Sequence, residues 1–135
     1  MTDTYNTRQQ LFNNAWNGFK SQDWKLSKNN VESIIAPMGT CLYRGPNGTK
    51  CGIGWSIPDE KYNQKFEGVA VCYVQEDTTD PRLLTAKELT KAAGILDKDI
   101  GFAMNLQCVH DRCLEENLEK RMREFAQINK LTIPE

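Results

Sequence analysis

The chain has 135 residues, of which 39% are hydrophobic, and its 17 basic and 18 acidic side chains give a formal net charge of −1. This length and composition are typical of one globular domain, which we expect to span residues 1–135. The balanced charge disfavours a nucleic acid partner, for which a basic excess is typical. No apolar run approaches the ~20 residues that span a bilayer, and the polar N-terminus lacks the order of a signal peptide. We therefore expect a cytoplasmic protein without a membrane partner.

Both ends of the chain carry helical patterns. Residues 5–20 predict an amphipathic helix whose apolar positions recur at helical spacing, at Leu11, Phe12, Ala15, Trp16 and Phe19. Residues 85–94 predict another helix, with a capping box at its start and a glycine at its end. A further helix opens at Asp97 and loses its pattern near residues 110–113. The last helix carries the apolar residues Leu114, Leu118, Met122 and Phe125.

The strongest local signal lies in the middle of the chain. Two β-prone runs, residues 40–44 and 49–55, flank the sequence Gly-Pro-Asn-Gly, and Asn-Gly tolerates the positive φ angles that tight hairpin turns need. A continuous apolar run of strand length follows at residues 69–74. We therefore expect an α+β fold: a small antiparallel sheet centred on a β-hairpin at about residues 39–57, with a third strand at 69–75, packed against N-terminal and C-terminal helices.

Four polar or aromatic side chains around this hairpin are candidates for contact with a ligand or partner: Arg44, Asn47, Lys50 and Trp55. Arginine and lysine suit an anionic group, and tryptophan suits an aromatic one. A solvent-facing turn collects similar residues without binding anything, so the pattern leaves both interpretations open.

Two glycines, Gly52 and Gly54, alternate along one face of the second run. Glycine in a strand often marks a place where a helix backbone or a ligand packs closely. Of these two explanations, we favour the helix.

The five cysteines are an odd number, which argues against a disulfide framework in a reducing compartment. A zinc site is the alternative, with Cys41, Cys51, Cys108, His110 and Cys113 as the candidate ligands. Their pairs are ten and five residues apart, whereas structural zinc sites usually space close pairs by two to four. We therefore favour buried, inert thiols and expect no metal cofactor.

His110 and Asp111 resemble a base beside its orienting acid, and both are candidate binding residues. Neighbouring residues on a helix do not face the same way, so we do not expect a ready-made dyad. A cysteine that met His110 across the fold would provide a nucleophile and its base. We favour the simpler interpretation, in which the pair ends a helix, and assign no catalytic residue.

Residues 41–62 resemble a motif of small uncharacterised bacteriophage proteins, Cys-x-Tyr-Arg-Gly-Pro-x-Gly-x-Lys-Cys-Ala-Ile-Gly followed by Leu-Ile-Pro-Asp-Glu-x-Tyr. Residues 106–111 are similar to a second block of that family, and residues 125–134 to its ending. Gly52 replaces the common alanine and Ser56 the common leucine. The family has no established activity to transfer, so the resemblance implies an origin: a phage accessory protein that acts in the cytoplasm of a bacterial host.

Three functional hypotheses follow. The favoured one is a non-enzymatic phage accessory protein that binds and neutralises a host component, either a defence protein or a small nucleotide-like signalling molecule. The second is a small hydrolase or transferase that uses a cysteine with His110. The third is a zinc-stabilised interaction module. The sequence leaves a homo-oligomer open and does not identify the target.

Overall fold

The computed structural model describes residues 5–29, 40–67, 69, 82–112 and 114–134. This part of the chain is mostly helical, and its α-helices are α1 (Arg8–Ser21), α2 (Arg82–Ala92), α3 (Ile100–Asp111) and α4 (Leu118–Ile128). The strands β1 (Lys28–Asn29) and β2 (Thr40–Cys41) pair antiparallel over two residues each. Short 3-10 turns occur at Pro46–Gly48, Gly54–Ser56, Asp59–Lys61, Gln64–Phe66, Asp97–Asp99 and Glu115–Asn117.

The helix α1 is the central element, and it confirms the helix predicted at residues 5–20. Thr7 caps its start in a capping box: Gln10 donates its backbone N–H to the Thr7 hydroxyl at 3.1 Å, and Thr7 donates its own to the Gln10 side chain at 2.8 Å. At the other end, the backbone N–H of Trp24 reaches the carbonyl of Phe19 at 2.8 Å. This bond closes the helix in a Schellman motif.

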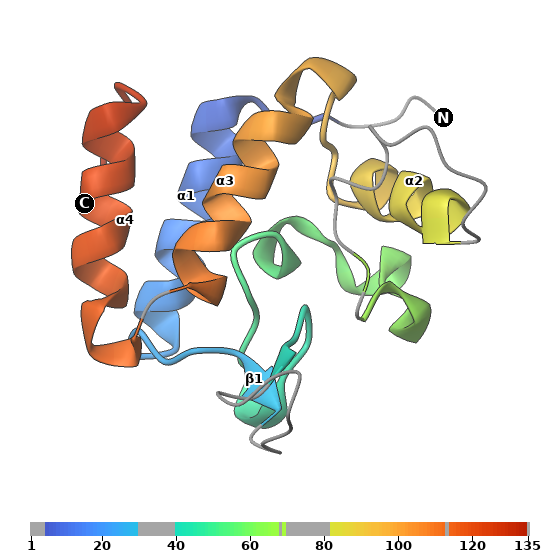
Figure 1. Ribbon diagram of the computed structural model, residues 1–135, viewed down its shortest axis with the longest axis horizontal. Helices are drawn as coiled ribbons and strands as arrows, with labels where there is room; N and C mark the ends of the chain where they lie inside the picture. The colour runs from blue at the N-terminus through green and yellow to red at the C-terminus, as the bar shows by residue number, and fades with distance from the viewer. Residues whose placement is uncertain (1–4, 30–39, 68, 70–81, 113, 135) are drawn as a thin grey trace.

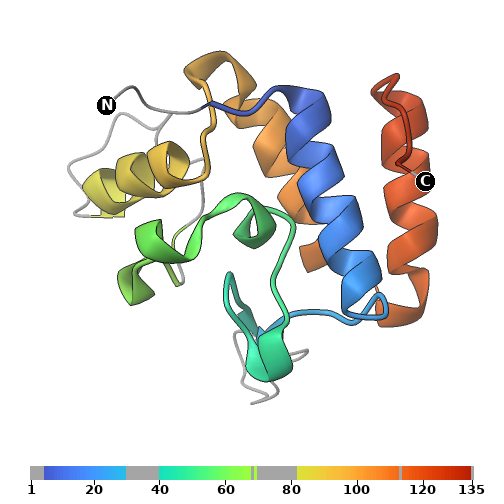
Figure 2. The ribbon, with the colours of Figure 1, turned by 180° about the vertical axis from the view of Figure 1, so that it is seen from behind.

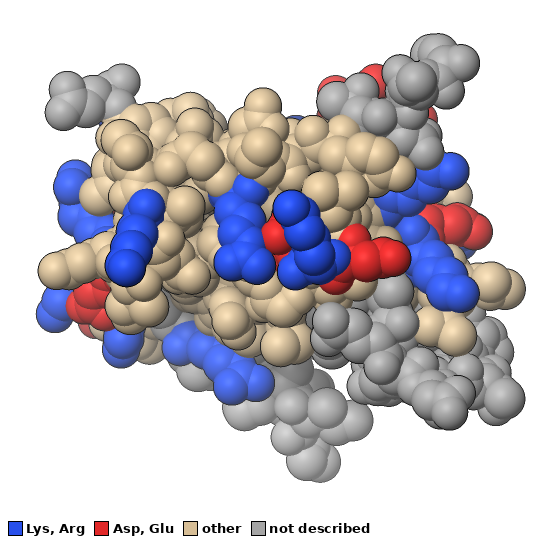
Figure 3. All heavy atoms as spheres, turned by 90° about the horizontal axis from the view of Figure 1, so that it is seen from above, with Lys and Arg blue, Asp and Glu red and all other residues tan. Residues whose placement is uncertain are grey.

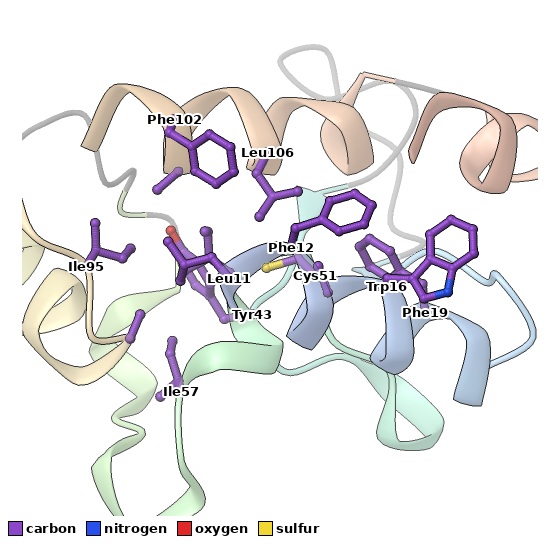
Figure 4. Close-up of a cluster of buried hydrophobic side chains, with 14 of the residues drawn as sticks. Leu11, Phe12, Trp16, Phe19, Tyr43, Cys51, Ile57, Ile95, Phe102 and Leu106 are labelled. Atoms are coloured by element: carbon purple, nitrogen blue, oxygen red, sulfur yellow. The ribbon is translucent and has the colours of Figure 1, made fainter. Parts of the chain in front are cut away.

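The helices α1, α3 and α4 lie side by side in a layer, and α2 lies apart from them, beside the turns of residues 54–66 (Figures 1 and 2). The hydrophobic core fills the space among these helices and between them and the middle of the chain (Figure 4). Aromatic rings connect the helices: Phe125 of α4 stacks on Phe12 of α1 at 6.2 Å and lies 5.4 Å from Phe102 of α3. A fully buried side chain such as Phe12 contributes about 2 kcal/mol by burial alone.

The expectation of an α+β fold is wrong, because the described residues form almost no sheet. β2 pairs with β1 and not with residues 49–55, so no β-hairpin forms at 39–57. The chain instead makes a 3-10 turn at Gly54–Ser56, where Ser56 donates its backbone N–H to the carbonyl of Ile53 at 2.9 Å. Of the third strand expected at 69–75, Val69 is buried outside any strand, and the other residues lie outside the described ranges.

Side chains, not strand partners, satisfy the backbone of this middle segment. Gln22 of the α1 C-cap pairs twice with Lys50: its Oε1 accepts the backbone N–H at 3.0 Å, and its Nε2 donates to the carbonyl at 3.1 Å. Gln107 of α3 accepts the backbone N–H of Ile53 at 3.0 Å. Buried backbone groups need such partners, and long polar side chains here replace a ladder.

The predicted helix ends are partly correct. The helix α2 begins at Arg82, so the expected capping box at Thr85 lies inside the helix. Gly94 follows this helix with a φ of 69°, as a helix-ending glycine should. Leu114 was placed on the apolar side of the last helix, but it precedes α4 and is half exposed.

The face that Figure 3 shows carries more basic than acidic side chains. Lys and Arg side chains stand there in separate groups, some beside acidic side chains, and they do not merge into one basic patch. Within the described ranges, every helix is too short or too polar to cross a membrane.

Two glycine-to-alanine substitutions test how closely α1 packs. A Cβ at Gly18 would lie 2.2 Å from Cδ2 of Trp55, whereas a Cβ at Gly101 of α3 would meet no atom within 4 Å. We expect Gly18→Ala to lower the free energy of unfolding by about 2 kcal/mol through overpacking. Gly101→Ala is expected to raise it by up to ~1 kcal/mol through helix propensity. Urea denaturation measures both, and a stabilised Gly18→Ala variant would contradict this packing.

Candidate functional site

The predicted tight turn is present, although no hairpin is built on it. Thr49 donates its backbone N–H to the carbonyl of Pro46 at 3.1 Å, and Gly45 donates to that of Thr49 at 2.8 Å. Asn47 and Gly48 have φ angles of 59° and 75°, the left-handed region that Asn-Gly accommodates. Asn47 is exposed at the tip, so it shapes the backbone, and the structure does not bring it to the groove described below.

Arg44 leads from this turn into a set of internal contacts. Its guanidinium forms an ion pair with the Asp59 carboxylate, donates to the carbonyl of Ile57 at 2.9 Å and lies 4.7 Å from the ring centroid of Tyr62. The Arg44 guanidinium, followed by the Lys50 ammonium, lowers the pKa of the exposed Asp59 carboxyl. Arg44 therefore connects residues 57–62 to the turn, while its Nε is buried and has no hydrogen-bond partner among the described residues.

Glu67 completes this arrangement from the other side. Its carboxylate accepts the backbone N–H groups of Tyr43 at 2.9 Å and Arg44 at 3.1 Å. The same carboxylate accepts the Tyr62 hydroxyl at 2.7 Å. Burial, with the neighbouring Glu67, raises the pKa of Tyr62 to about 12, so the phenol stays protonated as a donor.

Lys50 and Trp55 lie together beside this cluster. The Lys50 ammonium is 4.5 Å from the Trp55 ring centroid and 3.9 Å from the Asp59 carboxylate. The indole also packs closely on Gly18 of α1. Its Nε1 is buried and makes no hydrogen bond within the part of the chain that the structure describes.

A groove of about 480 Å³ opens at this indole, between α1, the turns of residues 54–61 and the end of α2. We call it the Trp55 groove; it is lined by Asn6, Asn14, Lys50, residues 55–61 and residues 92–94. Its charged side chains balance, because two lysines at positions 50 and 61 accompany two acids at 59 and 60. Of the six predicted candidate residues, the groove therefore includes Lys50 and Trp55, with Arg44 behind Asp59.

His110 and Asp111 lie elsewhere, at the last turn of α3. The expectation that they would not pair is wrong: Nδ1 of His110 lies 2.8 Å from Oδ1 of Asp111. The ring is fully buried, stacks on Phe19 at 5.6 Å, and its Nε2 accepts the backbone N–H of Ser27 at 2.8 Å. This acceptor role leaves Nδ1 to donate to the carboxylate. His110 thereby connects α3 to the start of β1.

Cys51 lies next to this network and is fully buried. Gly54 donates its backbone N–H to the Cys51 sulfur at 3.4 Å. Burial, followed by the nearby charge of Asp111, raises the pKa of the thiol to about 12. The thiol is therefore protonated at neutral pH, as expected for an inert buried cysteine.

The structure describes the side chains of only some of the candidate zinc ligands, namely Cys51, Cys108 and His110. Within the described ranges, no group of three or more His, Cys, Asp or Glu residues is arranged to hold a metal ion. The Cys41 side chain, Cys72 and Cys113 lie outside the described part of the structure.

Several residues that build the groove's surroundings were missed by the sequence analysis. Gln22, Glu67 and Gln107 act through their side chains on distant backbone groups, and no local pattern marks such a role. The pairing of Asp59 with Arg44 could have been suspected from the sequence, because Asp59 lies in the Ile-Pro-Asp-Glu sequence only fifteen residues from Arg44. Gly52 has a helical neighbour, as favoured, because a Cβ there would lie 3.3 Å from the carbonyl oxygen of Leu106 in α3. Gly54 does not, because a Cβ there would lie 2.3 Å from the carbonyl oxygen of Tyr43, outside any helix.

Comparisons with known proteins found no matching family model, no matching curated protein and no matching solved structure.

Native-state alkylation tests the placement of the cysteines. We expect iodoacetamide to modify the partly exposed Cys108 and to spare Cys51, because Cys51 is buried and its thiolate is scarce. Peptide mass mapping after a short reaction at pH 8 measures both sites, and the same reaction in urea is the positive control. Equal modification of the two thiols in the folded protein would contradict the buried position.

The pH dependence of stability provides a separate test. Because folding raises the pKa of Cys51 from 9.0 to about 12, the unfolded chain loses this proton first as the pH rises. The contribution of the protonated Cys51 thiol to stability is complete below pH 9 and declines above pH 9. We expect the free energy of unfolding to fall by about 1.4 kcal/mol more between pH 8 and pH 10 than in Cys51→Ala. If the free energy of unfolding changed with pH in the same way in both proteins, the raised pKa of Cys51 would be excluded.

Proposed function

We propose that this protein is a non-enzymatic bacteriophage accessory protein that binds and neutralises a host protein in the bacterial cytoplasm. The Trp55 groove is the contact site, and it receives a projecting segment of that partner. The phage origin is supported by the resemblance of residues 41–62 to small phage proteins. The observation that carries the binding site is the open, charge-balanced groove of about 480 Å³, which the partly exposed Trp55 ring lines together with Lys50.

The chemistry of the groove favours a polypeptide over a nucleotide. A phosphate would meet the carboxylates of Asp59 and Glu60, and the nearest arginine is already engaged by Asp59. A protein segment offers apolar side chains to the Trp55 ring and charged side chains of both signs to the rim. Tryptophan is also among the residues that contribute most to protein interfaces.

The geometry supports binding better than it supports cysteine catalysis. A thiol nucleophile needs an adjacent base with a free ring nitrogen. Nε2 of His110 instead accepts a backbone N–H in the core, and Cys51 is held protonated. These two described groups therefore serve the fold, and the groove lies elsewhere.

The groove is tested by comparing partner capture by matched variants. The wild-type protein is used to isolate a dominant partner from a bacterial lysate, and the affinity for the purified partner is then measured by calorimetry. Trp55→Phe replaces the indole with a smaller ring and so removes part of the aromatic surface of the groove, and we expect affinity to fall by about fivefold, equivalent to about 1 kcal/mol. Lys61→Glu reverses an exposed charge on the rim of the groove. We expect this variant to bind the partner more weakly than Trp55→Phe does.

The control is Lys120→Glu, which makes the same charge reversal on the exposed surface of α4. It should bind the partner with wild-type affinity. Partner binding that is unchanged in both groove variants, or reduced equally by Lys120→Glu, would show that the Trp55 groove is not the contact site.

A further inference from the structure

A second pocket lies between α1, α4 and the C-terminal residues, away from the Trp55 groove. It has a volume of about 340 Å³, at the lower end of the range for small-molecule sites. We call it the tryptophan pocket; it is lined by Trp16, Lys20, Trp24, Glu119, Arg123, Ile133 and Pro134. Gln9 fixes the C-terminal wall, because its side chain pairs with both the backbone N–H and the carbonyl of Thr132, at 2.9 and 2.7 Å.

Two of the three tryptophans of the chain meet in this pocket. The rings of Trp16 and Trp24 have centroids 4.8 Å apart and are inclined at 72°. Trp16 is only 3% exposed, and its Nε1 makes no hydrogen bond within the described residues. Trp24 is partly exposed and therefore supplies the aromatic surface of the pocket, while the buried Trp16 ring supports it from behind.

The backbone that places Trp24 is strained. Asp23 and Trp24 have φ angles of 57° and 60°, in the left-handed region. Aspartate adopts this region fairly readily, but a bulky residue such as tryptophan rarely does. Strained residues cluster at ligand sites, where the surrounding structure maintains a costly conformation. The strain here holds the Trp24 ring against Trp16.

The charges of the pocket favour an anion. Lys20 is exposed and forms no ion pair within the described residues. Arg123 directs its Nε and Nη2 to Glu119 at 3.1 and 2.9 Å, and its guanidinium lies 5.0 Å from the Trp16 ring. Nη1 of Arg123 has no described partner. Two cations therefore face one carboxylate.

We propose that the tryptophan pocket binds a small planar aromatic ring that carries an anionic group. The ring packs against the partly exposed indole of Trp24, and the anion contacts Lys20 and Nη1 of Arg123. Nucleoside monophosphates and aromatic carboxylates share this chemistry. The site is independent of the Trp55 groove and goes beyond the proposed function.

Four probes separate the two requirements: AMP and indole-3-acetate carry both a ring and an anion, adenosine lacks the anion, and inorganic phosphate lacks the ring. We expect at least one of the first two to bind the full-length protein with a Kd of about 1 mM or tighter. Adenosine and phosphate should each bind at least tenfold more weakly. In nitrogen-15 NMR spectra, the indole N–H signals of Trp16 and Trp24 should move, and that of Trp55 should not.

Substitutions then locate the site. Lys20→Ala and Arg123→Gln should each weaken binding by about tenfold, whereas the matched controls Lys25→Ala and Arg121→Gln, outside the pocket lining, should not. Trp24→Gly removes the ring and suits the positive φ, so it should lose binding while circular dichroism shows retained helix. The proposal is overturned if neither aromatic anion binds, if adenosine binds equally well, or if only the Trp55 signal moves.

Discussion

The fold depends on long polar side chains that supply hydrogen bonds to a backbone segment without strand partners. Residues 42–54 lie under the helical layer, where unpaired backbone groups are costly. Gln22, Glu67 and Gln107 supply these bonds, and His110 does the same for the preceding segment at Ser27. Each of them spans from another part of the chain, so these contacts determine where the middle segment lies against α1 and α3.

This arrangement explains what could and could not be predicted. The helices follow from apolar spacing and local capping, and the turn follows from Asn47 and Gly48, because these signals lie within a few residues of their effect. The β-prone runs gave the wrong fold class. An apolar run shows that a segment is buried, but burial fits an irregular chain as well as a strand when distant side chains satisfy its backbone.

The candidate site was predictable to a similar degree. Lys50 and Trp55 meet because only five residues separate them along a turning chain. The contacts of Arg44 within the protein were not foreseen: its guanidinium pairs with Asp59, and its backbone N–H donates to the carboxylate of Glu67. The Trp16 and Trp24 pairing was invisible in the sequence, because it depends on two successive residues with positive φ that helical spacing does not indicate.

The side-chain partners of the middle segment also determine its dynamics. A backbone amide in a helix exchanges its hydrogen with solvent only when several neighbouring bonds open together, but the amides of Lys50 and Ile53 are each held by a single glutamine. Rotation of that glutamine breaks the bond, but only a partly exposed amide then meets solvent. We therefore expect the amide of the partly exposed Lys50 to exchange at lower free energy than that of the fully buried Ile53 or those inside α1.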